Sequence, residues 1–205
     1  MTTSADIRLC NEALRLLGEF GIVSFEEGTD QAQTVGAIYS SKLTYLLTLH
    51  PWRFTLTKQR LARLTDVPDS EWLYMHALPV PMLALRSLFP TNAAGASPVK
   101  QYEIYGNRVL SNLQDLWADY QVATDPDTWP PYFRQLALAA LAADFSMAVG
   151  AGMSAADVFH RRAFGSPAEM MNGGLLGAAR RLDSMQQPGS GIRDFPLVTA
   201  RFGRG

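Results

Sequence analysis

The most apolar segment of the chain, residues 136–151, limits the possible folds more than any other feature. It is short for a bilayer span and contains an aspartate and a serine, so we interpret it as part of a buried helix. Pro130 suits the first position of that helix, Asp127 or Thr128 can cap it, and the pattern continues to about Val149. A helix that is apolar nearly all round needs other helices around it. The sequence therefore predicts a helical bundle with this segment at its centre.

Two earlier segments have helical periodicity. Apolar residues spaced three or four apart predict a helix over residues 4–17, with Gly18 as its C-terminal cap. A second apolar face predicts a helix over residues 30–50. Pro51 ends this helix, because a residue that precedes proline is pushed out of helical geometry.

The last helical region is predicted to be discontinuous. Ser154 with Asp157 resembles a capping box at its start. Residues 165–167, Gly-Ser-Pro, interrupt the region and offer cap chemistry for a new start. Gly173-Gly174 is a second weak point, since each helical glycine costs about 1 kcal/mol relative to alanine. The final helical stretch is expected at about residues 175–186.

The pattern changes between residues 52 and 124, where short segments rich in Tyr, Val, Thr and Leu alternate with turns. Gly106-Asn107 is a two-residue hairpin signal between two such segments. We therefore predict roughly seventy residues of antiparallel sheet inserted between helices. The expected strands are residues 71–78, 83–89, 101–105, 108–111 and 116–123.

Together these patterns predict an α+β fold that is mainly α. An antiparallel helical bundle comprises residues 1–51 and 125–187, an inserted antiparallel β domain comprises residues 52–124, and residues 188–205 are an extended C-terminal arm. Apolar side chains alternate with arginines along the arm, so it is expected to bind a surface; the alternative is a disordered chain end. The candidate binding residues are Arg193, Phe195, Leu197, Val198, Arg201 and Phe202.

Charge and cysteine content argue against several classes of function. With 18 basic and 19 acidic side chains the formal charge is -1, so non-specific attraction to nucleic acid or to an anionic membrane is not expected. Cys10 is the single cysteine, which excludes an intramolecular disulfide and fits a protein made in a reducing cytoplasm. Residues 1–15 lack the pattern of a secretory signal peptide.

The titratable residues show no pattern of a catalytic, cofactor or metal site. His50, His76 and His160 have no spacing typical of a metal site or a catalytic triad, and we expect isolated surface or capping histidines. Asp125 and Asp127 could be imagined as paired carboxylates, but their place at a helix start favours capping. The sequence therefore predicts no enzyme, no cofactor and no metal.

A short aromatic motif follows the helix-ending Pro51. We interpret Trp52 and Phe54 as core anchors that fix the helix against the sheet, in preference to a base-stacking role. The nearby basic residues are expected to form a solvated strand edge, with contact to DNA or an acidic partner as the alternative. They are Arg53, Lys58, Arg60 and Arg63.

Several segments, in order, resemble the tail tubular protein A family of short-tailed phages and related head-to-tail adaptors. The main landmark is residues 50–54, His-Pro-Trp-Arg-Phe, which is close to the family's His-Pro-Trp-x-Phe. The resemblance covers about residues 4–150 and resumes at residues 178–186. The chain departs from the family at residues 78–81 and at Pro167, which interrupts a last helix that is usually continuous. Further matching segments are residues 11–18, 22–27, 72–79, 120–126 and 133–143.

The resemblance implies a structural virion protein of the phage neck and tail, made in the host bacterial cytoplasm. Such proteins form a dodecameric ring under the portal protein. The helical domain packs against neighbouring copies and the portal, and the inserted sheet faces the downstream tail protein, a nozzle or tail-tube component. Genome DNA passes through the ring during ejection without specific binding, and no membrane or cofactor is involved. The alternatives are a tail-associated enzyme such as a cell-wall hydrolase, and a helical DNA-binding module.

Overall fold

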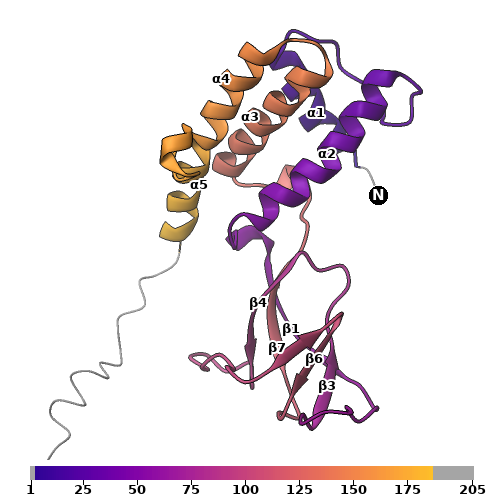
Figure 1. The fold of residues 1–205 in the computed structure, drawn as a ribbon, viewed down its shortest axis with the longest axis vertical. Helices are drawn as coiled ribbons and strands as arrows, with labels where there is room; N and C mark the ends of the chain where they lie inside the picture. The colour runs from indigo at the N-terminus through magenta and orange to yellow at the C-terminus, as the bar shows by residue number, and fades with distance from the viewer. Residues whose placement is uncertain (1–2, 187–205) are drawn as a thin grey trace, which may run out of the picture.

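The computed structural model describes residues 3–186, so the C-terminal arm, residues 188–205, lies outside the described residues. The described fold is α+β and mainly α, as predicted. The molecule is long, with a helical unit at one end and a β unit of two antiparallel sheets at the other (Figure 1). The helical unit comprises α1 (Ser4–Leu16), α2 (Asp30–Thr48), α3 (Pro131–Ala148), α4 (Met153–Phe164) and α5 (Gly174–Met185).

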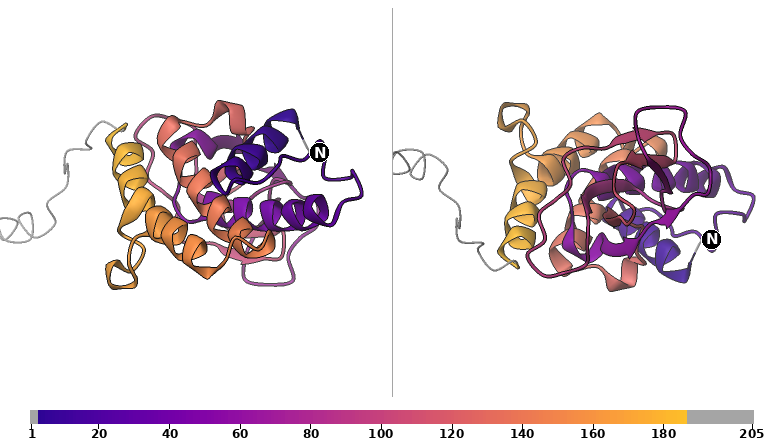
Figure 2. Two further views of the ribbon diagram at one scale, coloured as in Figure 1. Left: turned by 90° about the horizontal axis from the view of Figure 1, so that it is seen from above. Right: turned by 90° about the horizontal axis from the view of Figure 1, so that it is seen from below.

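The central helix of the bundle is α3, as its composition predicts. All residues from 136 to 143 are buried. The helices α1 and α2 pack against α3, and so do α4 and α5, which lie on its other side (Figure 2). Alanines allow this close approach from several directions. Within residues 3–186, no helix is both long and apolar enough to cross a membrane.

The start of α3 differs from the prediction, because neither Asp127 nor Thr128 caps it. Both residues lie in a 3-10 turn, η2 (Pro126–Thr128), which has its own cap. The Asp125 carboxylate accepts the Asp127 N–H at 2.9 Å. The helix begins at Pro131 directly after Pro130, with no side-chain cap. Pro130 was predicted at the first helical position, but Pro131 occupies it and Pro130 is the residue before. Because proline has no N–H, Pro131 leaves one donor fewer to be satisfied at the helix start.

The helix α1 is closed at both ends by local hydrogen bonds. At its start, the Thr3 hydroxyl accepts the Asp6 N–H at 3.3 Å, and the Asp6 carboxylate accepts the Thr3 N–H at 2.7 Å. At its end, Gly18 adopts a φ of 81°. The Gly18 N–H donates to the Arg15 carbonyl and the Glu19 N–H to the Leu14 carbonyl, both at 3.1 Å. Glycine suits this left-handed position because it has no Cβ.

The last helical region is broken, as predicted, although one predicted cap is wrong. The Ser154–Asp157 capping box does not form: α4 starts at Met153 without a side-chain cap, and Asp157 pairs with Arg161 at 2.8 Å. The capping box at Ser166 is present and starts a 3-10 turn, η3 (Pro167–Glu169), rather than an α-helix. The chain resumes as α5 at Gly174, within the predicted weak point.

The β unit contains two sheets where one was expected. The five predicted strands are present, β6 with the predicted limits and the other four shorter, and the Gly106-Asn107 hairpin joins two of them. The strands β1 and β2 contain three of the basic residues that were expected at a strand edge, although no limits were predicted for these strands. In the first sheet β7 lies between β1 and β4, and in the second the order is β2-β3-β6-β5. The strands are β1 (Leu56–Arg60), β2 (Ala62–Arg63), β3 (Tyr74–Ala77), β4 (Ala84–Phe89), β5 (Glu103–Tyr105), β6 (Arg108–Ser111) and β7 (Trp117–Gln121).

The two units have separate hydrophobic cores. The helical core contains residues from all five helices together with Trp52 and Trp129. The smaller core of the β unit includes Leu61, Leu88 and Val109. The chain enters the β unit through β1 and leaves it through β7, and these strands pair antiparallel. Both connections between the units therefore lie at the same end of the first sheet.

Candidate functional site

The aromatic motif after α2 lies at the junction between the two units. The Trp52 side chain is fully buried, and its indole N–H donates to the Leu46 carbonyl at 2.9 Å. That carbonyl belongs to the last turn of α2 and has no partner within the helix. The Trp52 ring meets the Phe133 ring edge-on, with centroids 4.9 Å apart, and Phe54 lies 4.8 Å from the same ring. Pro51 is exposed at the end of the helix.

Asp183, from α5, ties the same junction together. Its carboxylate is 1% exposed and accepts three hydrogen bonds from distant parts of the chain. The Arg53 N–H donates at 3.1 Å, the Tyr132 hydroxyl at 2.8 Å, and His50 Nε2 lies at 3.2 Å. One side chain thus joins α5 to α3 and to the segment that leads into the β unit. A buried carboxylate is tolerated only with such a set of partners.

The protonation states of His50 and Tyr132 allow both side chains to donate a hydrogen bond to Asp183. Burial lowers the pKa of His50, although the Asp183 carboxylate acts in the opposite direction. The neutral imidazole can then donate its Nε2 proton to Asp183. Burial, and after it the hydrogen bond to Asp183, raises the pKa of Tyr132, so this hydroxyl keeps its proton and remains a donor.

A second buried side chain, Gln121 of β7, joins the β unit to the end of α2. Its amide nitrogen lies 3.0 Å from the Leu47 carbonyl and 2.9 Å from both the His50 carbonyl and the Thr55 hydroxyl. The Arg86 guanidinium donates to the amide oxygen of Gln121. Two of the carbonyls at the end of α2, those of Leu47 and His50, are therefore satisfied by a side chain of the β unit. This junction holds the two units in one orientation.

The histidines do not converge. His50 lies at the junction, while His160 in α4 contacts the Phe164 ring at 5.0 Å. The expectation of a surface or capping position is wrong for His76, which is fully buried in β3. Its Nε2–H donates to the Leu113 carbonyl at 3.0 Å, and burial lowers its pKa. Within residues 3–186, no three His, Cys, Asp or Glu side chains are grouped so that they could hold a metal ion.

The basic residues of the first strands are paired locally. Lys58 lies 3.8 Å from the Asp119 carboxylate and 4.0 Å from the centre of the Phe89 ring. Arg60 pairs with Asp115, whose pKa is lowered by this hydrogen bond. Arg63 of β2 lies over the Tyr74 ring, 5.6 Å from its centre. Carboxylates therefore balance two of these charges, those of Lys58 and Arg60, which weakens attraction to a nucleic acid.

Exposed apolar side chains gather at the end of the helical unit that is farthest from the junction. Because α2 ends at the junction and α3 begins there, the loop before α2 and the turn after α3 both lie at this far end (Figure 1). Phe20 and Val23 in the loop are 89% and 86% exposed, and Met147 and Met153 flank the turn at 59% and 77%. We call these four residues the helical tip.

The opposite end of the molecule also presents apolar side chains. The strand β1 runs away from the helices and leads into β2, which pairs antiparallel with β3. The loop of residues 64–73 between β2 and β3 therefore lies at the end of the β unit away from the helices. Val67 and Leu73 of this loop are 82% and 62% exposed. We call these two residues the β tip. Large apolar side chains that are exposed at both ends of a molecule are candidates for contact with partner proteins.

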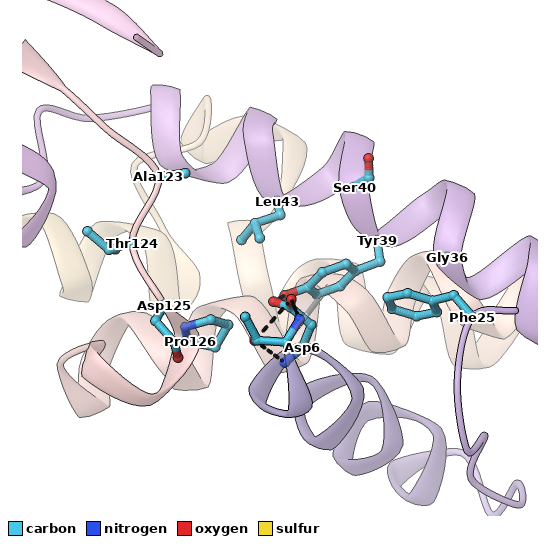
Figure 3. Close-up of a pocket in the computed structure, with 11 residues that line it drawn as sticks. Asp6, Phe25, Gly36, Tyr39, Ser40, Leu43, Ala123, Thr124, Asp125 and Pro126 are labelled. Carbon is cyan, nitrogen blue, oxygen red and sulfur yellow. Dashed lines mark hydrogen bonds between the residues drawn. The ribbon is translucent and has the colours of Figure 1, made fainter. Parts of the chain in front are cut away.

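A groove of about 550 Å³ lies on the side of the helical unit, between the start of α1, the middle of α2 and the connection from β7 to η2 (Figure 3). Phe25 and Leu43 give it apolar walls, and Asp6 and Asp125 give it two carboxylates. The Tyr39 hydroxyl donates to Asp6 at 2.6 Å, and burial followed by this bond raises the pKa of Tyr39. The groove can accept an apolar side chain beside a cation.

The sequence indicated only part of this geometry. Trp52 and Phe54 were singled out and lie at the junction, and the arm residues Arg193, Phe195, Leu197, Val198, Arg201 and Phe202 lie outside the described residues. Asp183, Gln121 and the groove were not singled out, because each depends on segments far apart in the chain. No model in the comparison with protein families matches the chain, and no curated protein matches it either.

Proposed function

We propose that the chain is a head-to-tail adaptor of a bacteriophage, a structural ring subunit that connects the portal protein to the downstream tail protein. The observation that carries the proposal is the pair of exposed apolar tips at opposite ends of a long subunit. A protein that bridges two partners along one axis needs a separate contact surface at each end. The resemblance of residues 50–54 and the flanking segments to the tail tubular protein A family supports the same function.

The junction fits this role for a mechanical reason. An adaptor can stack coaxially between two partners only if its ends keep a constant relative orientation. Gln121 of β7 supplies that constraint directly, because it bonds the end of α2, and Trp52 and Asp183 hold the segment that leads into β1 against the helical unit. The local pairing of basic side chains fits a channel wall that lets genome DNA pass without specific binding.

In the proposed assembly the subunits form a closed ring, dodecameric in the family that the sequence resembles, located in the neck and tail of the virion. The helical tip faces the portal protein, and the β tip faces the nozzle or tail-tube protein. The ring requires no cofactor, and its contacts are many and individually weak. Closure makes such contacts effective, because later bonds form at high effective concentration.

The test is co-expression with the portal protein of the same phage, followed by affinity purification and electron microscopy. We expect a second coaxial ring on the portal. The double variant Phe20→Ser, Val23→Ser should lose portal binding, whereas Val67→Ser, Leu73→Ser should keep it. Val158→Ser removes a side chain that is 63% exposed on α4 and is the matched control. A well-folded chain that forms no complex with the portal would exclude the proposed function.

A further inference from the structure

The charged side chains that line the groove beside α1 and α2 are all acidic. Its lining includes Asp6 and Asp125 and contains no lysine or arginine. Asp125 is exposed, and its carboxylate accepts a single side-chain hydrogen bond, from the Asp127 N–H, which leaves capacity for a further donor. Phe25 lies beside Tyr39, with ring centroids 5.7 Å apart, and forms an apolar wall next to the acidic one (Figure 3).

The C-terminal arm has the complementary composition. Residues 188–205 contain three arginines and a single aspartate, so the segment is cationic. Phe195 and Phe202 each lie one or two residues from an arginine, which places an aromatic ring beside a cation twice in the segment. This combination of apolar and cationic groups matches the combination of apolar and acidic groups in the groove.

The point where the arm begins favours a groove on another subunit. The arm follows α5, which packs on α3 and α4, while α1 and α2 lie on the other side of α3 (Figure 2). Residues of α1 and α2 line the groove, so the groove lies on that side too. To reach its own groove, the arm would have to pass around the helical unit. In a ring of rotationally related copies, each interface joins two different flanks of the subunit. The α5 flank and the groove flank are two such flanks, so a ring can bring the arm of one copy to the groove of the next.

We propose that the C-terminal arm of one subunit binds the groove between α1, α2 and the β7–η2 connection of the neighbouring subunit. The inference rests on the proposed function, because a ring is what sets the two flanks side by side. The eighteen residues of the arm can extend up to about 60 Å, so the arm can span the boundary between two subunits. Arginines of the arm pair with Asp125 and Asp6, and its phenylalanines contact Phe25 and Leu43.

Disulfide trapping between full-length chains tests the contact. One chain carries Ser40→Cys in the groove, and a second carries Thr199→Cys in the arm, which spares the apolar and basic arm residues. Cys10 is fully buried, and burial raises the pKa of its thiol, so it does not compete. The chains are mixed, oxidised with and without portal protein, and separated on a non-reducing gel. Val158→Cys on α4 replaces Ser40→Cys in the control mixture.

We expect a cross-linked dimer from the Ser40→Cys and Thr199→Cys mixture, with at least a tenfold lower yield in the Val158→Cys control. Adding Asp125→Asn keeps the cap and removes the charge, and it should slow cross-linking about threefold, the effect of one exposed ion pair. Equal yields in mixture and control would overturn the inference. So would a cross-link that forms only within a single chain carrying both cysteines, because the arm would then bind its own groove.

The two proposals fail separately in this experiment. Rings that bind the portal but give no arm–groove disulfide contradict the contact and leave the head-to-tail function standing. Chains that form the disulfide between copies but ignore the portal contradict the head-to-tail function and leave the arm–groove contact standing.

Discussion

Replacing Trp52 with alanine tests the role of the junction most directly. Truncating a fully buried large aromatic side chain costs about 3–5 kcal/mol. Trp52 should lie near the upper end of that range for two reasons. Its indole satisfies the Leu46 carbonyl at 2.9 Å, which would become a buried acceptor without a partner. Its edge contact with Phe133 is also lost, and such contacts contribute about 0.5–1.5 kcal/mol beyond burial. We therefore expect a loss of about 5 kcal/mol.

The assay is urea unfolding followed by circular dichroism at a helical wavelength, which does not depend on tryptophan fluorescence. Trp72→Ala is the matched control, because Trp72 is half-buried in the loop before β3 and donates to Glu103 at 3.1 Å. For a chain of this size, 1 kcal/mol corresponds to about 2–4 °C in Tm. Trp52→Ala should therefore melt about 10 °C or more below wild type. If the two variants unfold within about 1 kcal/mol of each other, the core-anchor interpretation is refuted.

Two further predictions concern charged groups. Asp183→Ala leaves several buried donors without an acceptor, so it should lower the free energy of unfolding in urea by about 3 kcal/mol. The control Asp157→Ala removes an exposed helical ion pair and should lower it by about 0.5 kcal/mol. Equal losses in the two variants would contradict the buried role of Asp183. The pKa values of His50 and His76 are lowered by burial below 6.5, so the unfolded chain binds more protons than the native one just below that pH. Tm should consequently fall as the pH is lowered from 7.5 to 5.5, and His76→Gln should reduce that fall. A Tm that stays constant or rises would show that the histidines are not held neutral.

The elements with strong local patterns were predictable. The central α3 follows from a segment that is apolar all round, and the Gly106-Asn107 hairpin follows from its turn residues. The basic residues of β1 were expected at a strand edge, but the limits of the strand escaped prediction because most of its side chains are exposed and it carries no alternating pattern. The division into two sheets depends on which strands pair. Pairing is a long-range property, and a strand pattern does not encode its partner.

The candidate site was predictable only where its residues are close in sequence. Trp52 could be identified from the sequence because it directly follows a helix-ending proline. Asp183 gives no such signal, since it lies on a predicted amphipathic helix where an aspartate is expected to face solvent. Its burial results from contact with Arg53 and Tyr132, 130 and 51 residues away. The burial of Asp183 therefore cannot be predicted before the packing of α5 is known.

The position of Asp183 also decides how assembly variants of this chain have to be interpreted. It lies two residues before Met185, where α5 ends and the segment leading to the arm begins. A substitution at Asp183 changes the junction and the base of the arm together, so a loss of ring formation there would not identify the cause. Asp125→Asn changes only the acceptor groove. A variant that disturbs assembly without lowering Tm therefore points to the arm–groove contact, whereas one that lowers both points to the junction.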